Sequence, residues 1–166
     1  MSEWRFKLLY DGGCPLCVRE ASEGAPVQAG TITIARGNWH LELLAAAQRS
    51  ASPTLHLTQA PPENHCRPAV DVLFRSVASV YGGSVVAVVL TGMGSDGLAG
   101  CRVLRSAGST VLAQDQATSA VWGMPGTVAA AGLADRVLPL GAIGPEIVRL
   151  AGRGGAATQT LERPVA

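Results

Sequence analysis

A six-residue apolar run, Val85–Leu90, leads directly into the glycine-containing loop Thr91–Gly97. Four of the six residues are valines, and glycines flank the run within two positions on either side. A short, wholly apolar run of β-branched residues predicts a strand buried on both faces, as in a parallel sheet. Open α/β sheets carry ligands and catalytic groups on the loops at the carboxyl ends of their strands. Asp96, in this loop, is therefore the first candidate for a functional carboxylate.

Strand and helix patterns alternate along the chain beyond residue 68. Apolar residues at helical spacing predict a helix that begins near Pro68 and ends near Gly82. Later segments continue the alternation, with a helix across residues 98–107, a strand at 110–113, a helix from Pro125 to Gly132, a strand at 136–140 and a helix at 145–150. This order predicts an α/β fold with a doubly wound, mostly parallel sheet flanked by helices.

The chain before residue 68 is predicted to contain shorter strands. Residues 5–10, 18–21 and 54–58 fit strands, and the turn Arg36-Gly37-Asn38 predicts a β-hairpin near residues 31–44. We divide the chain into a segment 1–17 with a strand and a Cys-x-x-Cys, a domain 18–152, and a flexible tail 153–166 that has little to bury.

Composition and charge exclude some classes of partner. The formal net charge of +1 gives no reason to expect nucleic acid. No run approaches the ~20 apolar residues that span a bilayer, so no membrane insertion is expected. The charged amino terminus lacks the apolar core of a signal peptide, which predicts a cytoplasmic protein with reduced cysteines. Oligomeric state is left open.

Two roles fit Asp96 on chemical grounds. A carboxylate on such a loop can orient an imidazole, while neighbouring N–H groups, such as that of Met93, face a developing oxyanion. Alternatively, Asp96 caps the helix that begins near Gly97. The two roles are compatible.

The sequence from Val89 to Gly97, Val-Leu-Thr-Gly-Met-Gly-Ser-Asp-Gly, resembles the signature of the CheB-type protein-glutamate methylesterases of bacterial chemotaxis. The similarity extends across roughly residues 18–150 in family order. It includes Val18–Gly24, Asn64–Phe74, Leu112–Asp115 and Trp122–Pro125.

This resemblance implies a doubly wound domain that hydrolyses glutamate methyl esters on the cytoplasmic segments of methylated chemoreceptors with a Ser-His-Asp triad and no cofactor. Asp96 matches the triad aspartate, and Met93 matches the residue whose backbone N–H contributes to the oxyanion hole. The family's serine segment (Gly-Ala-Ser-Thr-Gly-Gly type) and histidine segment (Gln-His-Met-Pro type) have no match in this sequence. Nucleophile and base are therefore unassigned, the fold is expected to be incomplete relative to the family, and the esterase activity is expected to be impaired.

Residues 5–17 are similar to the start of the DCC family of thioredoxin-like thiol-disulfide oxidoreductases. Cys14 and Cys17 form a Cys-x-x-Cys after the predicted strand 5–10, a spacing that suits a redox pair but also ordinary loop thiols. One Cys-x-x-Cys is half of a structural zinc site, so no metal site is predicted. Three functions follow as hypotheses: an impaired methylesterase, a thiol-disulfide oxidoreductase using Cys14 and Cys17, and a non-catalytic domain that binds receptors.

Overall fold

The computed structural model describes residues 17–46, 48 and 51–154. Its elements in chain order are β1 (Cys17–Glu20), β2 (Thr31–Ile34), β3 (His40–Leu44), β4 (Thr54–Thr58), α1 (Val70–Tyr81), β5 (Val86–Val89), α2 (Leu98–Ser106), β6 (Thr110–Gln114), α3 (Met124–Ala130), β7 (Arg136–Leu138) and α4 (Leu140–Gly154). The predicted strand 5–10 and most of the predicted tail lie outside the described residues.

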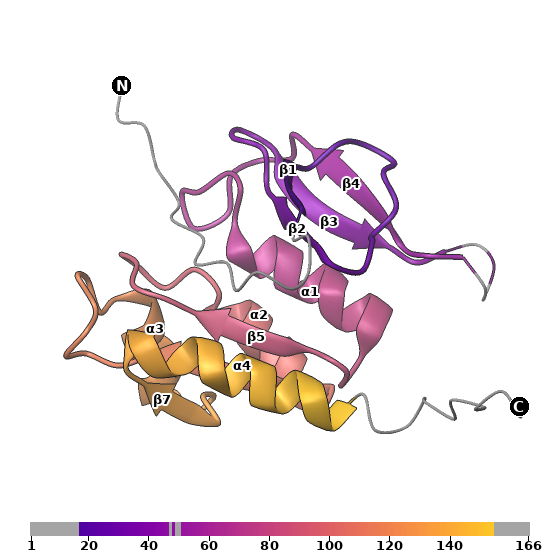
Figure 1. Cartoon of the computed structure of the whole chain (residues 1–166). Helices are drawn as coiled ribbons and strands as arrows, with labels where there is room; N and C mark the ends of the chain where they lie inside the picture. The colour runs from indigo at the N-terminus through magenta and orange to yellow at the C-terminus, as the bar shows by residue number, and fades with distance from the viewer. Residues whose placement is uncertain (1–16, 47, 49–50, 155–166) are drawn as a thin grey trace, which may run out of the picture.

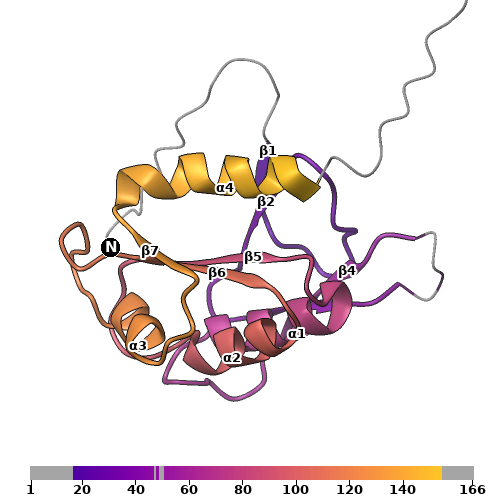
Figure 2. The same cartoon turned by 90° about the horizontal axis from the view of Figure 1, so that it is seen from below.

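A parallel three-stranded sheet in the order β5-β6-β7 carries the predicted buried strand at one edge. Figure 2 shows this sheet nearly edge-on, with α4 over one face and α2 and α3 over the other. Val111, Leu112 and Ala113 of the central strand are completely buried. Because helices cover both faces of the sheet, the side chains on both sides of β5 and β6 are apolar, and their sequences do not alternate between apolar and polar residues. The predicted α/β fold with a parallel sheet is confirmed.

The predicted hairpin at residues 31–44 is wrong in its strand partners. β2 pairs in parallel with β1, whereas β3 pairs antiparallel with β4. The turn at Arg36–Asn38 therefore leads from one sheet to another instead of closing a hairpin. Leu41 of β3 and Leu55 of β4 are buried in one core cluster, which the β3–β4 pairing brings together.

Helix α1 joins the two halves of the molecule, with β1 to β4 on one side and the β5 sheet on the other (Figure 1). Leu73 packs against the cluster of Leu41 and Leu55. Ala78 belongs to the larger cluster, which also contains Leu104 and Val128. Helix α1 thus has two apolar faces, one packed against β3 and β4 and the other against the cluster formed by α2 and the β5 sheet.

Helix α4 begins earlier than predicted. Pro145 was expected to open the last helix, but it lies inside a helix that starts at Leu140. Pro145 lies beyond the first turn and has no N–H to donate to the Gly141 carbonyl, so the helix continues without that one backbone hydrogen bond. Ile143, which is 4% exposed, anchors the added turn in the protein interior. None of the described helices is long and apolar enough to cross a bilayer.

Glu146 ties α4 to the last strand of the sheet. Its carboxylate accepts hydrogen bonds from Arg149 of α4 (Nε, 2.7 Å) and lies 3.0 Å from Arg136 Nη1 of β7. The hydrogen bond from Arg149, together with Arg136, lowers the pKa of Glu146 from 4.5 to about 2. Because the folded pKa is the lower one, the stabilisation is present above pH 4.5 and is lost as the pH falls towards 2.

We expect Glu146→Gln to lower the melting temperature at pH 7 and to flatten its dependence on pH between 4.5 and 2. Thermal unfolding followed by circular dichroism across this pH range measures both effects. Since both arginines are partly exposed, the difference from the wild type should narrow in 1 M salt, where the screening length is about 3 Å. An unchanged acid profile in the variant would contradict this assignment.

Candidate active site

The loop after β5 is fixed against the loop after β6. Gly92 N–H donates to the Val121 carbonyl at 3.0 Å, and Gly92 O accepts from the N–H of Met124 at 2.8 Å. A Cβ at Gly123 would lie 2.7 Å from Gly92 O and 2.9 Å from Gly94 N. Both atoms are backbone, so this approach requires glycine at position 123. The Thr91–Gly97 loop is therefore held by its neighbour rather than by its own turn alone.

Asp96 is 5% exposed, and its carboxylate is held by backbone N–H groups from two helices. Oδ2 accepts from Val70 N–H at 2.7 Å, and Oδ1 accepts from the N–H of Asp71 at 3.1 Å. Oδ1 also accepts from Gly97 N–H at 3.0 Å. Asp96 thus caps the first turn of α1 across the fold, whereas the cap predicted from sequence involved only the helix that follows Gly97. The positive end of α1 favours the charged carboxylate at this position.

Asn64 and Asp71 belong to the same network, and sequence reasoning gave neither of them a role. The Asn64 side-chain amide donates to Asp96 Oδ1 at 3.1 Å and to Asp71 Oδ2 at 2.9 Å. Asp71, 3% exposed, also accepts from Gly100 N–H of α2 at 2.6 Å. No sequence spacing relates residues 64, 71 and 96, so only the fold brings them together.

One lone pair of the Asp96 carboxylate is not used by these contacts. Oδ1 accepts from three donors, whereas Oδ2 accepts only from Val70 N–H among the described residues and can accept a second hydrogen bond. Met93, three residues earlier, is 86% exposed. Among the described residues, no acceptor is bonded to the Met93 N–H. The loop therefore holds a rigid carboxylate with remaining acceptor capacity and a backbone donor available to a ligand.

The described histidines do not complete a catalytic pair with Asp96. His40 is 1% exposed, its Nδ1 accepts from Ala69 N–H at 3.2 Å, and its Nε2 is 3.1 Å from the Pro61 carbonyl. His56 bonds to Glu23 through Nδ1 at 3.0 Å. His65 is exposed in a left-handed backbone conformation. In this part of the chain no hydrogen bond joins a histidine to Asp96, so the base stays unassigned.

The cysteines lie in different environments. Cys101 is completely buried in the core, and burial raises the pKa of its thiol to about 12, which makes it a poor nucleophile. Cys66 is an exposed free thiol. Cys14 lies outside the described residues, and Cys17 begins β1. Within the described ranges, no group of three histidine, cysteine or acidic side chains is placed to hold a metal ion.

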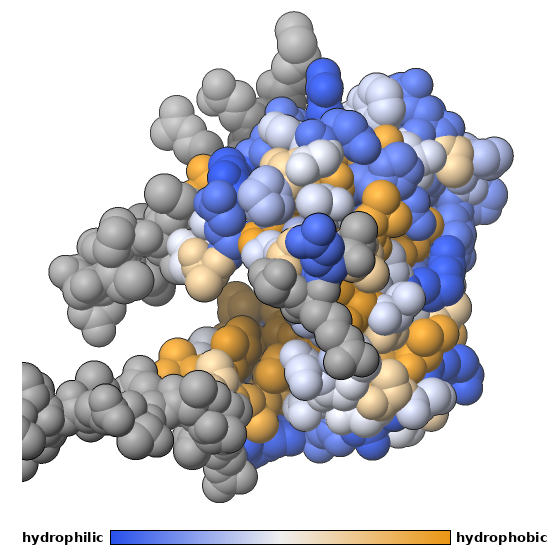
Figure 3. All heavy atoms as spheres, turned by 90° about the vertical axis from the view of Figure 1, so that its right-hand side faces the viewer, coloured by the Kyte–Doolittle hydropathy of each residue, from blue (hydrophilic) through white to orange (hydrophobic). Residues whose placement is uncertain are grey.

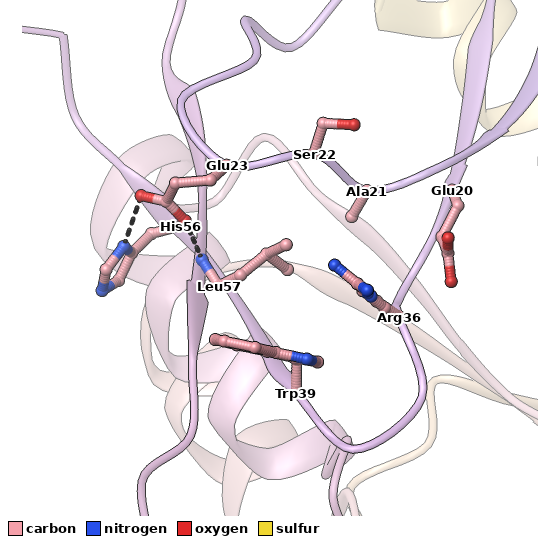
Figure 4. Close-up of a pocket in the computed structure, with 8 residues that line it drawn as sticks. All are labelled: Glu20, Ala21, Ser22, Glu23, Arg36, Trp39, His56 and Leu57. Atoms are coloured by element: carbon pink, nitrogen blue, oxygen red, sulfur yellow. Dashed lines mark hydrogen bonds and ion pairs between the residues drawn. The ribbon is translucent and has the colours of Figure 1, made fainter.

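A cleft of about 480 Å³ opens where β1 and β2 end, and its lining is drawn in Figure 4. The Arg36 guanidinium lies 5.8 Å from the centre of the Trp39 ring. Glu23, on the opposite wall, bonds to His56, and this hydrogen bond lowers the pKa of Glu23. The cleft therefore has the cation–aromatic pair of Arg36 and Trp39 on one side and the Glu23 carboxylate on the other (Figure 4).

Comparison with known proteins gives consistent matches. A family model described as CheB methylesterase matches residues 3–147. A protein-glutamate methylesterase/protein-glutamine glutaminase from Nocardioides sp. is 57% identical over 145 residues, covering 87% of this chain and 39% of that protein. A protein of the same name from Trichodesmium erythraeum is 52% identical over 139 residues, covering 84% of this chain and 39% of that protein.

The crystal structure of the Thermotoga maritima CheB methylesterase catalytic domain superposes with a TM-score of 0.76 at 38% identity. The match covers 80% of this chain and 68% of that domain. The chain thus spans about two fifths of the length of these curated relatives and about two thirds of the solved domain. The comparisons do not support the resemblance of residues 5–17 to the DCC family, because the matched range begins at residue 3.

Proposed function

Because this chain belongs to the CheB methylesterase family, we propose that it forms the aspartate-bearing part of a protein-glutamate methylesterase site. The chemistry is hydrolysis of glutamate methyl esters on the cytoplasmic segments of chemoreceptors, carried out in the cytoplasm. The names of the relatives also include a glutaminase activity, which removes the amide nitrogen of a glutamine side chain. This reaction takes place at the same type of side-chain acyl carbon. Domain 18–152 carries this site in the proposal.

The buried Asp96 carboxylate is the observation that supports this proposal most strongly. Four donors fix it at the carboxyl end of β5, and Oδ2 retains a lone pair for an imidazole N–H. Such a carboxylate holds the histidine tautomer and stabilises the imidazolium that forms during acyl transfer. The Met93 N–H, three residues away and without an acceptor among the described residues, is the donor that we propose for an oxyanion.

The nucleophile and the base are not assigned to any residue of this chain. Asp96 and Met93 alone position and stabilise groups, and they neither attack the ester carbon nor take the proton from the attacking nucleophile. We therefore propose that the chain by itself hydrolyses esters poorly, while the cleft at Arg36 and Trp39 contributes to receptor contact. No contact in the described residues favours the redox function of Cys14 and Cys17.

Incubation of the purified chain with receptor carrying tritiated methyl esters tests both parts. We expect no methanol release above the enzyme-free background, and we expect the chain to co-sediment with receptor-containing membranes. Methanol release by the wild type that is lost in an Asp96 variant would contradict the proposal that the chain by itself hydrolyses esters poorly. Absence of co-sedimentation would contradict the receptor-binding part, with receptor-free vesicles as the control.

A further inference from the structure

The cleft of about 480 Å³ at the ends of β1 and β2 shares no lining residue with the hydrogen-bond network of Asp96. Its walls come from the turn after β1, the turn after β2, and β4, and all of its lining residues are described. Strands β1 and β2 run parallel, and open α/β sheets bind ligands beyond the carboxyl ends of such strands. The volume is within the range of about 300 to 1,000 Å³ that is usual for small-molecule sites.

One charged pair in this cleft is already joined. Glu23 Oε1 lies 3.0 Å from His56 Nδ1, and Glu23 Oε2 accepts from Leu57 N–H at 2.6 Å. The next residue, Gly24, donates its N–H to the Leu55 carbonyl at 2.9 Å. These bonds hold the turn after β1 against β4, so this wall of the cleft is fixed and each Glu23 oxygen has a donor.

A second pair of opposite charges in the cleft is not joined. Among the described residues, the Arg36 guanidinium and the Glu20 carboxylate form no ion pair, either with each other or with another side chain. Arg36 lies 5.8 Å from the centre of the Trp39 ring, and Figure 4 draws its guanidinium between this ring and the Glu20 carboxylate. Contact with the ring restricts the guanidinium and uses none of its N–H donors. The cleft thus offers both a cation and an anion to a ligand.

We propose that this cleft binds a free α-amino acid with an aromatic side chain. The carboxylate of the amino acid accepts two hydrogen bonds from the Arg36 guanidinium, whose planar fork matches a carboxylate. The ammonium group of the amino acid donates to the Glu20 carboxylate. Its ring packs against Trp39 and Leu57, which also line the cleft.

Other ligands of similar size match the cleft less well. An acidic ligand without an ammonium group would pair with Arg36 but would be repelled by the carboxylates of Glu20 and Glu23. An amine without a carboxylate would be repelled by Arg36. An apolar ligand would remove both charges from water without a partner, and the surface over β1 to β4 is largely hydrophilic on the face drawn in Figure 3. A zwitterion pairs with both charges at once.

Titration of the full chain with L-phenylalanine, followed by the NMR signal of the Trp39 indole N–H, tests the proposal. We expect one saturable site with a Kd below about 10 mM. Phenylalaninamide lacks the carboxylate and N-acetylphenylalanine lacks the ammonium group, so each should bind at least about tenfold more weakly, or about 1.4 kcal/mol. Absence of saturable binding, or equal affinity for the three compounds, would overturn the proposal.

Substitutions assign each end of the ligand to its partner. Arg36→Gln and Glu20→Gln should each weaken L-phenylalanine binding at least about tenfold. Glu20→Gln should not weaken binding of N-acetylphenylalanine, because that compound has no ammonium group. Arg102→Gln is the matched control and should bind like the wild type, since Arg102 is exposed on α2 and does not line the cleft. Circular dichroism establishes that the variants are folded, and equal weakening by all three would contradict the assignment.

The same cleft contributes to receptor contact in the proposed function, so the amino acid and the receptor should compete for it. Only this competition rests on the proposed function. Saturating L-phenylalanine is expected to reduce co-sedimentation of the chain with receptor-containing membranes. If L-phenylalanine binds and co-sedimentation is unchanged, the receptor contact at the cleft is contradicted while amino-acid binding is supported.

Discussion

Replacement of Asp96 by alanine is expected to destabilise the fold by about 3 kcal/mol, because it removes the acceptor for three backbone N–H groups and one side-chain amide. Two of these N–H groups belong to Val70 and Asp71, the first residues of α1, which is the helix that joins the two halves of the molecule. The loss should therefore extend beyond the loop. Urea denaturation, followed by far-ultraviolet circular dichroism, measures the free energy of unfolding.

Two substitutions calibrate this result. Asp96→Asn keeps one acceptor oxygen and should lose roughly half as much stability. Asp115→Ala removes a carboxylate that accepts from Thr118 within a surface turn, and it should cost less than about 1 kcal/mol. An Asp96→Ala protein within about 0.5 kcal/mol of the wild type would show that water replaces the carboxylate without cost.

Gly123→Ala is expected to cost about 2 kcal/mol through a single overpacked contact. The added methyl would lie 2.7 Å from Gly92 O and 2.9 Å from Gly94 N, and neither backbone atom can rotate away. The φ of Gly123 is −83°, which alanine adopts without strain, so the contact alone carries the effect. We also expect the amide resonances of Met93 and Asp96 to shift, because the 92–94 backbone must move.

Gly141→Ala provides the matched control for this substitution. Gly141 lies inside α4, and a Cβ there would meet no atom within 4 Å. Alanine in a helix interior is favoured over glycine by up to about 1 kcal/mol, so this variant should be slightly more stable than the wild type. If the two variants unfold at the same urea concentration, the loop is not held by the Gly92–Gly123 approach.

The helices and strands were largely predictable because each carries its own periodic pattern. Apolar spacing located α1 and α2, and the unbroken apolar run 85–90 located β5. The structure, not the sequence, shows that β5 lies at the edge of its sheet. Which strand pairs with which was harder to predict from the sequence. The turn at Arg36–Asn38 fits a hairpin locally, yet β3 pairs with β4 because Leu41 and Leu55 must be buried together. The residues of a turn carry no information about which distant leucines are buried together.

The sequence by itself determined the family and the α/β architecture, and it made Asp96 the candidate carboxylate, because all three depend on short contiguous patterns. Tertiary structure alone decided what holds Asp96. Its partners Asn64, Val70 and Asp71 lie 25 to 32 positions away along the chain, and their contacts arise from the packing of the α1 amino terminus beside the β5 loop. Hydrogen-bond partners that are distant in sequence leave no periodic signal, since their proximity depends on how helices and sheets pack.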